Sequence, residues 1–379
     1  MATVEEIAKK LNKEFNSNNF ITKADITPEY QKLATNALGF DYPLFGGIPY
    51  GRIMTFAGKE HSGKTTAAFL VIAAYQRENP DKICVFVDFE HSADLKHQIK
   101  MNGVDMSKLL YVNPDVQSGE DVLDTIIELQ KGDNIGVIVI DSIPAIVPAK
   151  VMENDISKDM GMQGTIAKKL HVFTTQIAPM IANKNNILIF INQVRVSGKT
   201  FTGAPIYSEP GGDAPKYYSS VKIRFGTRTF TKEDDMDACK PDGDGADGFR
   251  LKYIITKNKT APCNRGGGFI TYRYATGLDW LHDLLEIAIQ FDFIHRVNNV
   301  TYELVNLDTG EVMVDESGNQ LRGKKKDLIN YILTHIDFQN TYLDMINRYI
   351  KDDSKSYGEL LDERSKAEIK EEANAVGDV

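Results

Sequence analysis

The stretch Gly58-Lys59-Glu60-His61-Ser62-Gly63-Lys64-Thr65 fits the pattern G-x-x-x-x-G-K-[ST] of a phosphate-binding loop. Glycines let backbone N–H groups curl around a phosphate, the Lys64 ammonium reaches its oxygens, and the Thr65 hydroxyl can bind Mg²⁺. The apolar run 52–57 predicts a buried strand before the loop, and residues 65–76 predict a helix whose N-terminus faces the anion. The sequence therefore predicts a nucleoside triphosphate site over Gly58–Thr66.

Composition limits the possible functions of the chain. Its 379 residues, of which 42% are hydrophobic, suggest roughly two to three domains of about 150 residues. No apolar run approaches the roughly 18 residues of a membrane span, and the polar N-terminus is unlike a signal peptide. The scattered cysteines Cys84, Cys239 and Cys263 favour a reducing cytoplasm. A net charge of −9 means that a polyanionic partner must meet a local basic track.

Apolar runs alternate with helical patterns after the loop. The predicted strands are 83–87, 109–112, 136–141 and 187–191, and the predicted helices are about 93–102, 119–130 and 165–181. Near-continuous apolar strands that alternate with helices indicate a parallel sheet buried on both faces. The later runs VKIRFG, RLKYIIT and GFITYRY predict an antiparallel extension, and the acidic segment 232–248 between them predicts a solvated hairpin loop.

The two ends of the chain differ from this core. Residues 3–16 predict a short amphipathic helix with a capping box formed by Thr3 and Glu6. Because so short a helix is marginal alone, it docks either on its own domain or on a neighbouring subunit, where Phe20 and Ile21 would pair beside it. The sequence from about Leu281 predicts a smaller α-rich module that ends in a mobile acidic tail. The expected divisions are an N-terminal oligomerisation segment (1–35), a core (36–280) and a C-terminal domain (281–379).

Polar side chains stand at the carboxyl ends of three predicted strands. Asp141 closes the apolar run 137–140 and is placed like an acid that binds Mg²⁺ directly or through water, although a helix N-cap would also explain it. Glu90 can accept a proton from the attacking water or orient it. Gln193 is a neutral amide suited to distinguishing ATP from ADP at the γ-phosphate. Because ligands bind at the carboxyl edge of such sheets, these residues predict one catalytic site.

Seven motifs, in this order and at these intervals, resemble the RecA recombinase family, in bacterial or phage UvsX-type form: GGIPYGRI, GKEHSGKTT, VFVDFEHSADL, GVIVIDSIPAIVP, ILIFINQVR, GGDAPKYYSSVKI and TKNKTAP. The resemblance covers roughly residues 36–280 and fades at both ends. It implies an α/β fold with a RecA-like phosphate-loop ATPase core, in which a mostly parallel sheet is flanked by helices and continued by an antiparallel extension. The implied cofactors are ATP and Mg²⁺.

The resemblance also implies roles for residues around the nucleotide. Glu90 would be the catalytic carboxylate that positions water, and Gln193 the γ-phosphate sensor that couples nucleotide state to the following loop. Lys64, which reaches the phosphate oxygens, would also belong to the catalytic residues. Asp94 and His97 would contact adenine, although the family often carries tyrosine where His97 stands. Tyr274 resembles the second adenine-side aromatic residue of the family.

Two further lysines receive a role only from the resemblance. Lys257 and Lys259 resemble the paired lysines that reach the ATP of a neighbouring subunit, whereas their local pattern alone indicates an exposed turn after a strand. Acting in trans, they would stabilise charge at the γ-phosphate. The ATP site would then be complete only at a subunit interface.

The stretch Val194–Tyr218 combines what a single strand of DNA requires. Charge comes from Arg195, Lys199 and Lys216, wedging or stacking side chains from Phe201 and Tyr207, and bare N–H groups from Gly211-Gly212. Its length and its glycine and proline content predict an irregular loop. The family places its second DNA-binding loop here and its first over Glu153–Gly164, which includes Met160 and Gly161.

Two other basic groups are open to both a DNA-binding and a solvated interpretation. On the helix after the first loop, Lys168 and Lys169 lie away from the predicted core face, and of the two Lys168 is the candidate for a DNA contact. The run Arg322–Lys326 could gather duplex DNA or form a solvated loop.

Three interpretations of function follow. The first is an Mg²⁺-dependent, DNA-dependent ATPase that forms a homo-oligomeric helical filament on single-stranded DNA and catalyses pairing and strand exchange with duplex DNA for recombinational repair. It predicts single-strand-binding and loader proteins as partners, no membrane contact and a cytoplasmic location. The second is a hexameric DNA helicase, which gives no reason for GGDAPKYY and TKNKTAP. The third is a small-molecule kinase, which requires an arginine-bearing lid that we do not find in the sequence.

Overall fold

The structure is a computed structural model. It describes residues 3–15, 30–92, 94–152, 163–199, 205–231, 245–262, 265–290, 294–306, 309–340, 342 and 344. The chain forms two compact units, Met1–Gln31 and Lys32–Val379.

The first unit contains helix α1 (Val4–Glu14). Its predicted capping box is confirmed, because the Glu6 N–H donates to Thr3 Oγ1 at 3.2 Å and the Thr3 N–H donates to Glu6 Oε2 at 2.9 Å. No residue of this helix is buried, and Val4 is 81% exposed. Docking of α1 on another surface stays a prediction, and Phe20 and Ile21 lie outside the described residues.

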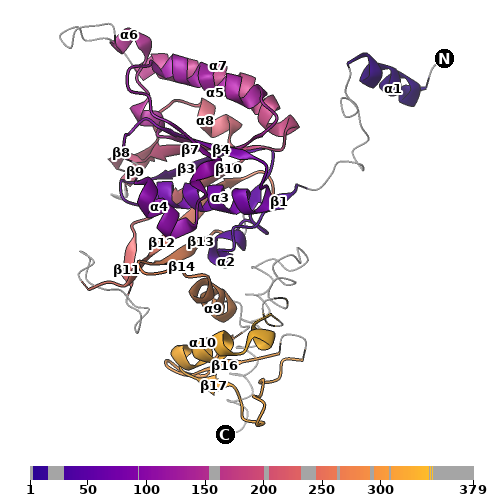
Figure 1. The fold of residues 1–379 in the computed structure, drawn as a ribbon, viewed down its shortest axis with the longest axis vertical. Helices are drawn as coiled ribbons and strands as arrows, with labels where there is room; N and C mark the ends of the chain where they lie inside the picture. Colours follow the sequence, from indigo (N-terminus) through magenta and orange to yellow (C-terminus); the bar gives the residue numbers. More distant parts are fainter. Residues whose placement is uncertain are drawn as a thin grey trace. The chain divides into compact units, whose positions relative to one another are not determined.

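A ten-stranded sheet forms the centre of the second unit, with the order β14-β13-β12-β10-β3-β7-β6-β4-β5 and β11 paired to β12 (Figure 1). Its strands are β3 (Arg52–Gly58), β4 (Ile83–Asp88), β5 (Leu109–Val112), β6 (Ile135–Asp141), β7 (Ile187–Gln193), β10 (Val221–Phe225), β11 (Thr229–Thr231), β12 (Gly248–Asn258), β13 (Gly267–Arg273) and β14 (Gly277–Leu278). The strands β10, β3, β7, β6, β4 and β5, neighbours in this order, pair in parallel. The pairs β10–β12, β11–β12, β12–β13 and β13–β14 are antiparallel. The predicted parallel sheet with an antiparallel extension is confirmed.

Two details of the sheet differ from the sequence-based expectation. The run VKIRFG, expected in the antiparallel extension, forms β10, which pairs in parallel with β3 and antiparallel with β12. The direction of the sheet therefore changes one strand later than expected. The lysine-bearing TKN stretch belongs to β12 rather than to an exposed turn, because β12 continues to Asn258.

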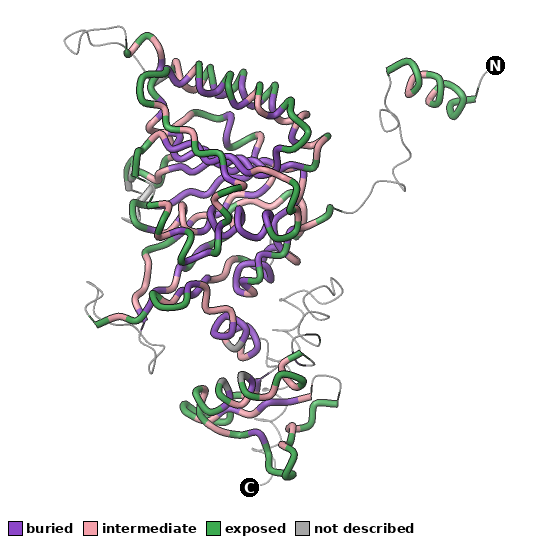
Figure 2. The backbone as a smooth tube through the Cα atoms, viewed as in Figure 1, coloured by how far each residue is buried: buried purple, intermediate pink, exposed green. Residues whose placement is uncertain are grey.

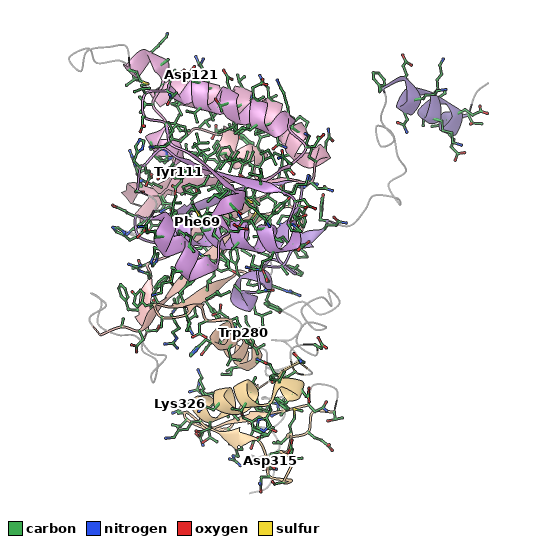
Figure 3. The ribbon with its side chains drawn as sticks, in the orientation of Figure 1. Phe69, Tyr111, Asp121, Trp280, Asp315 and Lys326 are labelled. Carbon is green, nitrogen blue, oxygen red and sulfur yellow. The ribbon has the colours of Figure 1, made fainter. Side chains whose placement is uncertain are left out.

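Helices cover both faces of the sheet. On one face α3 (Lys64–Glu78) and α4 (Leu95–Asn102) close a hydrophobic cluster, and on the other α5 (Gly119–Lys131) and α7 (Gln163–Asn183) close a second (Figures 1 and 2). On the α3 face, Phe69 stacks on Phe86 of β4 with ring centroids 4.5 Å apart, and Phe86 stacks on Tyr111 of β5 at 6.3 Å (Figure 3). The helix that follows the phosphate loop is thus packed rigidly on the sheet.

The remaining elements are short or C-terminal. They are β1 (Lys32–Leu33), α2 (Leu38–Asp41), β2 (Ile48–Pro49), the 3₁₀ turns η2 (Met106–Lys108) and η3 (Ile143–Ala145), α6 (Ala149–Met152), β8 (Arg195–Lys199), β9 (Pro205–Ser208), α8 (Ala214–Tyr218), α9 (Trp280–Gln290), β15 (Ile294–Arg296), β16 (Tyr302–Leu304), β17 (Arg322–Gly323) and α10 (Lys325–Thr334).

A third hydrophobic cluster joins α9, α10 and the sheet β15-β16-β17 to Tyr42 beside α2. The C-terminal part therefore combines helices with a small sheet, and residues on both sides of the expected boundary at 280 share one core. The division of the chain into three parts stays a prediction, and the acidic tail lies outside the described residues. The basic run Arg322–Lys326 forms β17 and the start of α10 rather than a loop, and Lys325 binds Glu286 at 2.7 Å.

No helix within the described residues has the length and apolar character needed to cross a membrane. Cys84 is a buried free thiol in β4, and burial raises its pKa to about 12, so it is an unreactive core residue. Cys239 and Cys263 lie outside the described residues.

Candidate active site and nucleic-acid loop

The phosphate loop joins the carboxyl end of β3 to the amino end of α3. Gly63 precedes the helix with a φ of 87°, and a Cβ atom there would lie 2.4 Å from Leu251 Cδ2, so both its backbone conformation and its packing require glycine. No side chain caps this end of α3. Its first-turn N–H groups therefore remain available to an anion, which is the geometry that phosphate binding needs.

Lys64 is held inside this loop. Its ammonium donates to the Lys59 carbonyl at 2.7 Å, and the Ser62 hydroxyl donates to the same oxygen at 2.7 Å. Burial lowers the pKa of Lys64, and the carboxylates of Asp141 and Glu90 oppose that shift. Because a phosphate oxygen is a stronger acceptor than a neutral carbonyl, a triphosphate in the loop would draw this ammonium away from Lys59.

Thr65 and Asp141 meet as the sequence predicted. The Thr65 hydroxyl donates to Asp141 Oδ2 at 2.7 Å, and Asp141 is only 3% exposed. Burial raises the pKa of Asp141 to about 7, and the nearby Glu90 and Asp88 carboxylates add to that rise. Crowded carboxylate and hydroxyl oxygens suit a hard divalent cation, so the residues present fit Mg²⁺. The described residues contain no cluster of three acidic, histidine or cysteine ligands, and such a cation would take its other ligands from phosphate and water.

Glu90 and Gln193 are in direct contact. The Gln193 side-chain amide donates to Glu90 Oε1 at 3.1 Å, and the Ser142 hydroxyl donates to the same oxygen. The contact between Ser142 and Glu90 follows from the register, because Asp88 pairs with Asp141 across β4 and β6 and brings the next residues of both strands together. The three polar residues expected at one sheet edge are therefore brought together, while their chemical roles stay predictions.

The predicted adenine-side residues lie on elements that adjoin the loop helix. Asn102 at the end of α4 donates to the Thr66 carbonyl at 3.4 Å and accepts from the Tyr272 hydroxyl of β13 at 2.9 Å. This residue ties α4 and β13 to the first turn of α3. Asp94 caps α4 by accepting from the His97 N–H at 3.0 Å, and Tyr274, which follows β13, is 37% exposed.

Lys257 and Lys259 lie toward the opposite edge of the sheet from the loop. Lys257 pairs with Lys222, which pairs with Thr55, and the Lys259 N–H donates to the Ser220 carbonyl. Thr55 is three residues before Gly58 on β3, and Ser220 lies beside Ile53, five residues before Gly58. The two lysines are therefore separated from the start of the phosphate loop by about 10–16 Å along the strand. The pair is therefore directed away from the phosphate loop of its own protomer.

Both lysines bind the carboxyl end of α8. Lys257 Nζ donates to the Lys216 carbonyl, and Lys259 Nζ donates to the Tyr217 carbonyl at 3.4 Å. Burial lowers the pKa of Lys257, and the charges of Lys259 and Lys222 lower it further. The carboxyl end of a helix attracts cations, which is consistent with the position of Lys257 and Lys259 at these carbonyls.

The stretch Val194–Tyr218 is more regular than expected. Strands β8 and β9 pair as an antiparallel hairpin, and the short helix α8 follows it, so the prediction of an irregular loop is wrong for the described part. Pairing satisfies the backbone hydrogen bonds that an irregular segment would leave to water. Gly211 and Gly212 have φ of 94° and 73°, and Cβ atoms there would approach Ile143 and Ala167, so packing as well as DNA can explain these glycines.

The other predicted DNA residues divide into placed and undescribed ones. Arg195 is exposed at the start of β8, and Lys168 is exposed on α7, opposite the buried Leu170 and Ile177. Lys199 ends β8, but its side chain is not described. Met160, Gly161 and Phe201 lie outside the described residues.

Sequence reasoning missed Ser142 and Asn102. Ser142 directly follows the predicted Mg²⁺ acid in the sequence, but only the strand register shows that its buried hydroxyl faces Glu90. Asn102 had no local signal, because its role depends on three elements that are distant in sequence.

A parallel sheet whose strand β3 ends in a glycine-rich loop, with a threonine–aspartate pair beside that loop, defines the phosphate-loop class of α/β proteins. A family model described as the RecA N-terminal domain matches residues 2–279. Protein RecA of Colwellia psychrerythraea is 31% identical over 290 residues, which are 76% of this chain and 79% of that protein. Protein RecA of Helicobacter acinonychis is 30% identical over 334 residues, 86% and 89% of the two chains. The protein belongs to the RecA family.

Proposed function

We propose that this protein is a DNA-dependent ATPase that forms a helical filament on single-stranded DNA and drives homologous pairing and strand exchange with a duplex. Family membership supports this proposal. The observation that carries it is the hydrogen bond from Gln193 to Glu90, because Gln193 ends β7 and the hairpin β8–β9 begins two residues later. A change at the γ-phosphate would therefore reach the proposed DNA-binding segment Val194–Tyr218, called the DNA loop below, through Gln193 alone.

Within one protomer, each side chain at the carboxyl edge has a distinct task. When bound, Mg²⁺-ATP supplies the phosphoanhydride bond that is cleaved; Thr65 and Asp141 would hold the cation, and Lys64 the β- and γ-oxygens. Glu90 Oε1 is occupied by Ser142 and Gln193, while Oε2 has no partner among the described residues. Oε2 would orient the attacking water and accept its proton.

The lysine pair would act on the next protomer. Lys257 and Lys259 are directed away from their own loop, and a head-to-tail interface would present them to the γ-phosphate of a neighbour. Such an interface does not close on itself unless its rotation permits, so repetition builds a helical filament. Base pairing would read the DNA sequence, and binding by Arg195, Lys199 and the loop backbone would be nearly sequence-neutral.

The test combines ATPase assays with electron microscopy. With single-stranded DNA, ATP hydrolysis should rise well above the rate without DNA, and a non-hydrolysable ATP analogue should give open helical filaments. Closed hexameric rings would favour the helicase alternative. Hydrolysis that is indifferent to DNA would remove both DNA-based functions.

A further inference from the structure

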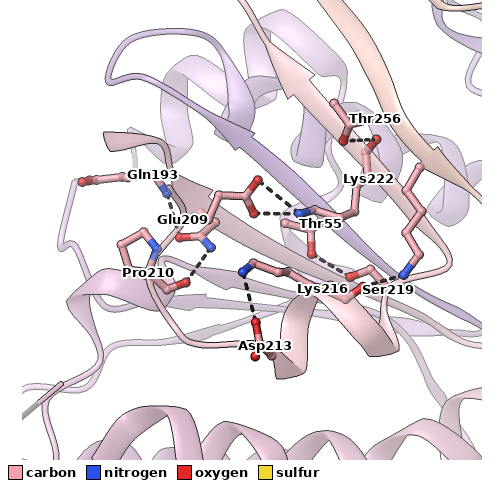
Figure 4. A network of polar contacts seen from close by, with 11 residues as sticks. Thr55, Gln193, Glu209, Pro210, Asp213, Lys216, Ser219, Lys222 and Thr256 are labelled. Carbon is pink, nitrogen blue, oxygen red and sulfur yellow. Dashed lines mark hydrogen bonds and ion pairs between the residues drawn. The ribbon is translucent and has the colours of Figure 1, made fainter. Parts of the chain in front are cut away.

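The segment Glu209–Ser219 between the hairpin and β10 is pinned to the sheet (Figure 4). At its start, Lys222 Nζ of β10 donates to Glu209 Oε1 at 3.1 Å and to Oε2 at 2.9 Å. Both side chains are largely removed from solvent, with 12% of Lys222 and 18% of Glu209 exposed. At its end, the buried Ser219 and Thr55 hydroxyls are 2.7 Å apart.

The ion pair is one of two matched contacts between this part of the chain and β10. Tyr207 lies against Arg224, whose guanidinium carbon is 5.5 Å from the ring centroid, and Glu209 binds Lys222. From the first contact to the second, the residue number rises by two in the segment and falls by two in β10. The segment therefore runs antiparallel to β10 over one face of it. The alternate β10 residues Val221 and Ile223 are buried in the cluster under α3, so the pair lies on the sheet face opposite that helix.

A second set of hydrogen bonds joins Pro210, the residue after Glu209, to Asn192, the residue before the proposed sensor Gln193. Asn192 Nδ2 donates to the Pro210 carbonyl at 2.9 Å, and Asn192 Oδ1 accepts from the Gln193 N–H at 2.9 Å. Residues 209 and 210 are therefore held by Lys222 of β10 on one side and by the side chain of Asn192, next to Gln193 on β7, on the other. The position of the hairpin relative to Gln193 depends on these contacts.

We propose that the Glu209–Lys222 ion pair is a latch that fixes the DNA loop to the nucleotide-bearing sheet, so that tight binding of single-stranded DNA requires this acid. The inference rests on the proposed function. Removing either partner leaves a largely buried charge unpaired, and the loop would have to detach from β10 to hydrate it. Glu209 and Lys222 are positioning residues in this account, because neither has to touch DNA or nucleotide.

The latch predicts an effect opposite in sign to simple electrostatics. Neutralising an acid in a loop that binds a polyanion should strengthen binding if only long-range charge matters. The latch predicts weaker binding instead. In the same segment Asp213 binds Lys216 at 3.1 Å, but this pair is exposed, with 67% and 50% of the two side chains accessible, and it lies within the segment. Asp213→Asn changes the charge by the same amount without touching the latch and is the matched control.

The experiment measures binding of a fluorescent polythymidine oligonucleotide to the full-length protein with a non-hydrolysable ATP analogue. Glu209→Gln should weaken binding about tenfold, the size expected for one charged hydrogen-bonded contact. The slope of log affinity against log salt should stay unchanged, because no phosphate contact is lost. Asp213→Asn should bind as tightly as the wild type or more tightly. Affinity for a fluorescent nucleotide, unchanged in both variants, verifies that they are folded.

A charge swap completes the test. Lys222→Glu alone should weaken DNA binding, and the double variant Glu209→Lys with Lys222→Glu should recover most of the loss, which gives a large coupling energy in a double-mutant cycle. Glu209→Gln that binds DNA as well as Asp213→Asn, or single effects that add without rescue, would overturn the latch. A wild-type protein that binds no single-stranded DNA would overturn the proposed function itself, which separates the two failures.

Discussion

The parallel and antiparallel parts of the sheet present their candidate functional residues differently. In the parallel part, Asp141 is bonded to Thr65, and Glu90 to Gln193, all at one edge. In the antiparallel part, Lys257 and Lys259 are bonded to carbonyls of α8 and are directed away from the loop of their own protomer. The first group is assembled within one chain, whereas the second lies about 10–16 Å along the sheet from the loop of its own protomer, and its action on a neighbouring protomer stays a prediction.

Burial shows the same contrast. Every residue of β6 is buried, whereas in β12 the residues from Leu251 onward alternate between buried and exposed and end in half-exposed positions. Strands covered by helices on both faces are continuous apolar runs, while a strand with one open face must alternate. The open face of the antiparallel part is where a partner would find exposed side chains, and the predictions below separate the two parts.

The largest effect is expected from Lys64→Ala in the parallel part. This substitution removes the ammonium that binds the β- and γ-oxygens and should weaken nucleotide binding on the order of 1000-fold, which abolishes turnover. Titration with a fluorescent ATP analogue measures it, and an unchanged thermal unfolding curve is the control. Binding within a few-fold of the wild type would contradict the assignment of the loop.

The double variant Lys257→Ala with Lys259→Ala should separate the two parts most clearly. Nucleotide affinity of the isolated protomer should stay unchanged, because both lysines face away from its loop. DNA-stimulated turnover should fall about 10³-fold, the lower end of the range for fingers that act in trans. Steady-state ATPase assays with single-stranded DNA measure it, and a loss of nucleotide affinity in protein that does not assemble would place the lysines in the wrong site.

Glu90→Gln should spare binding and remove chemistry. The amide keeps the size of the side chain but cannot accept a proton from water, so turnover should fall by about 10²–10³ with nucleotide affinity retained. Single-turnover hydrolysis measures this step directly. Hydrolysis at the normal rate would show that another group positions the water.

The smallest effect concerns stability at the end of the antiparallel part. Burial raises the pKa of Asp279, but His282 and Arg273, whose Nε donates at 2.7 Å, outweigh it and lower the pKa to about 2. The folded pKa lies below the unfolded value, so the ionised carboxylate stabilises the fold above pH of about 4, and this contribution is lost as the pH falls toward 2.

Asp279→Asn should therefore lower the free energy of unfolding by about 2 kcal/mol at pH 7 and by about half as much near pH 3. Urea denaturation at both pH values measures the difference. Asp124→Asn, at an exposed position on α5, should stay within about 0.5 kcal/mol of the wild type. Equal losses for Asp279→Asn at both pH values would contradict the ionic origin of the contribution.

The parallel part of the fold was predictable because its information is local. Each of its predicted strands is an apolar run of a few residues, and Asp141 and Gln193 end their runs while Glu90 lies two residues past the end of β4. The rule that ligands bind at the carboxyl edge then places all three together without knowledge of the tertiary structure. The spacing of the phosphate loop fixes the first turn of α3 in the same way.

The rest depended on contacts that no local pattern encodes. The hairpin β8–β9 was missed because glycine and proline suggested an irregular loop, whereas pairing and the contact of Glu209 with Lys222 hold it in place. The function of Lys257 was suggested only by the family resemblance, since its own neighbourhood indicated a turn. Ser142 and Asn102 became visible only once strand register and helix packing were known.

The central claim, that lysines of one protomer complete the ATP site of the next, is tested most directly by mixing two inactive variants. Glu90→Gln keeps the lysines, and the double variant Lys257→Ala with Lys259→Ala keeps Glu90. In a random one-to-one filament about a quarter of the interfaces pair an intact Glu90 with intact lysines, so about a quarter of the wild-type ATPase rate should return on single-stranded DNA. A mixture no more active than its two components would show that the lysines do not act across the interface.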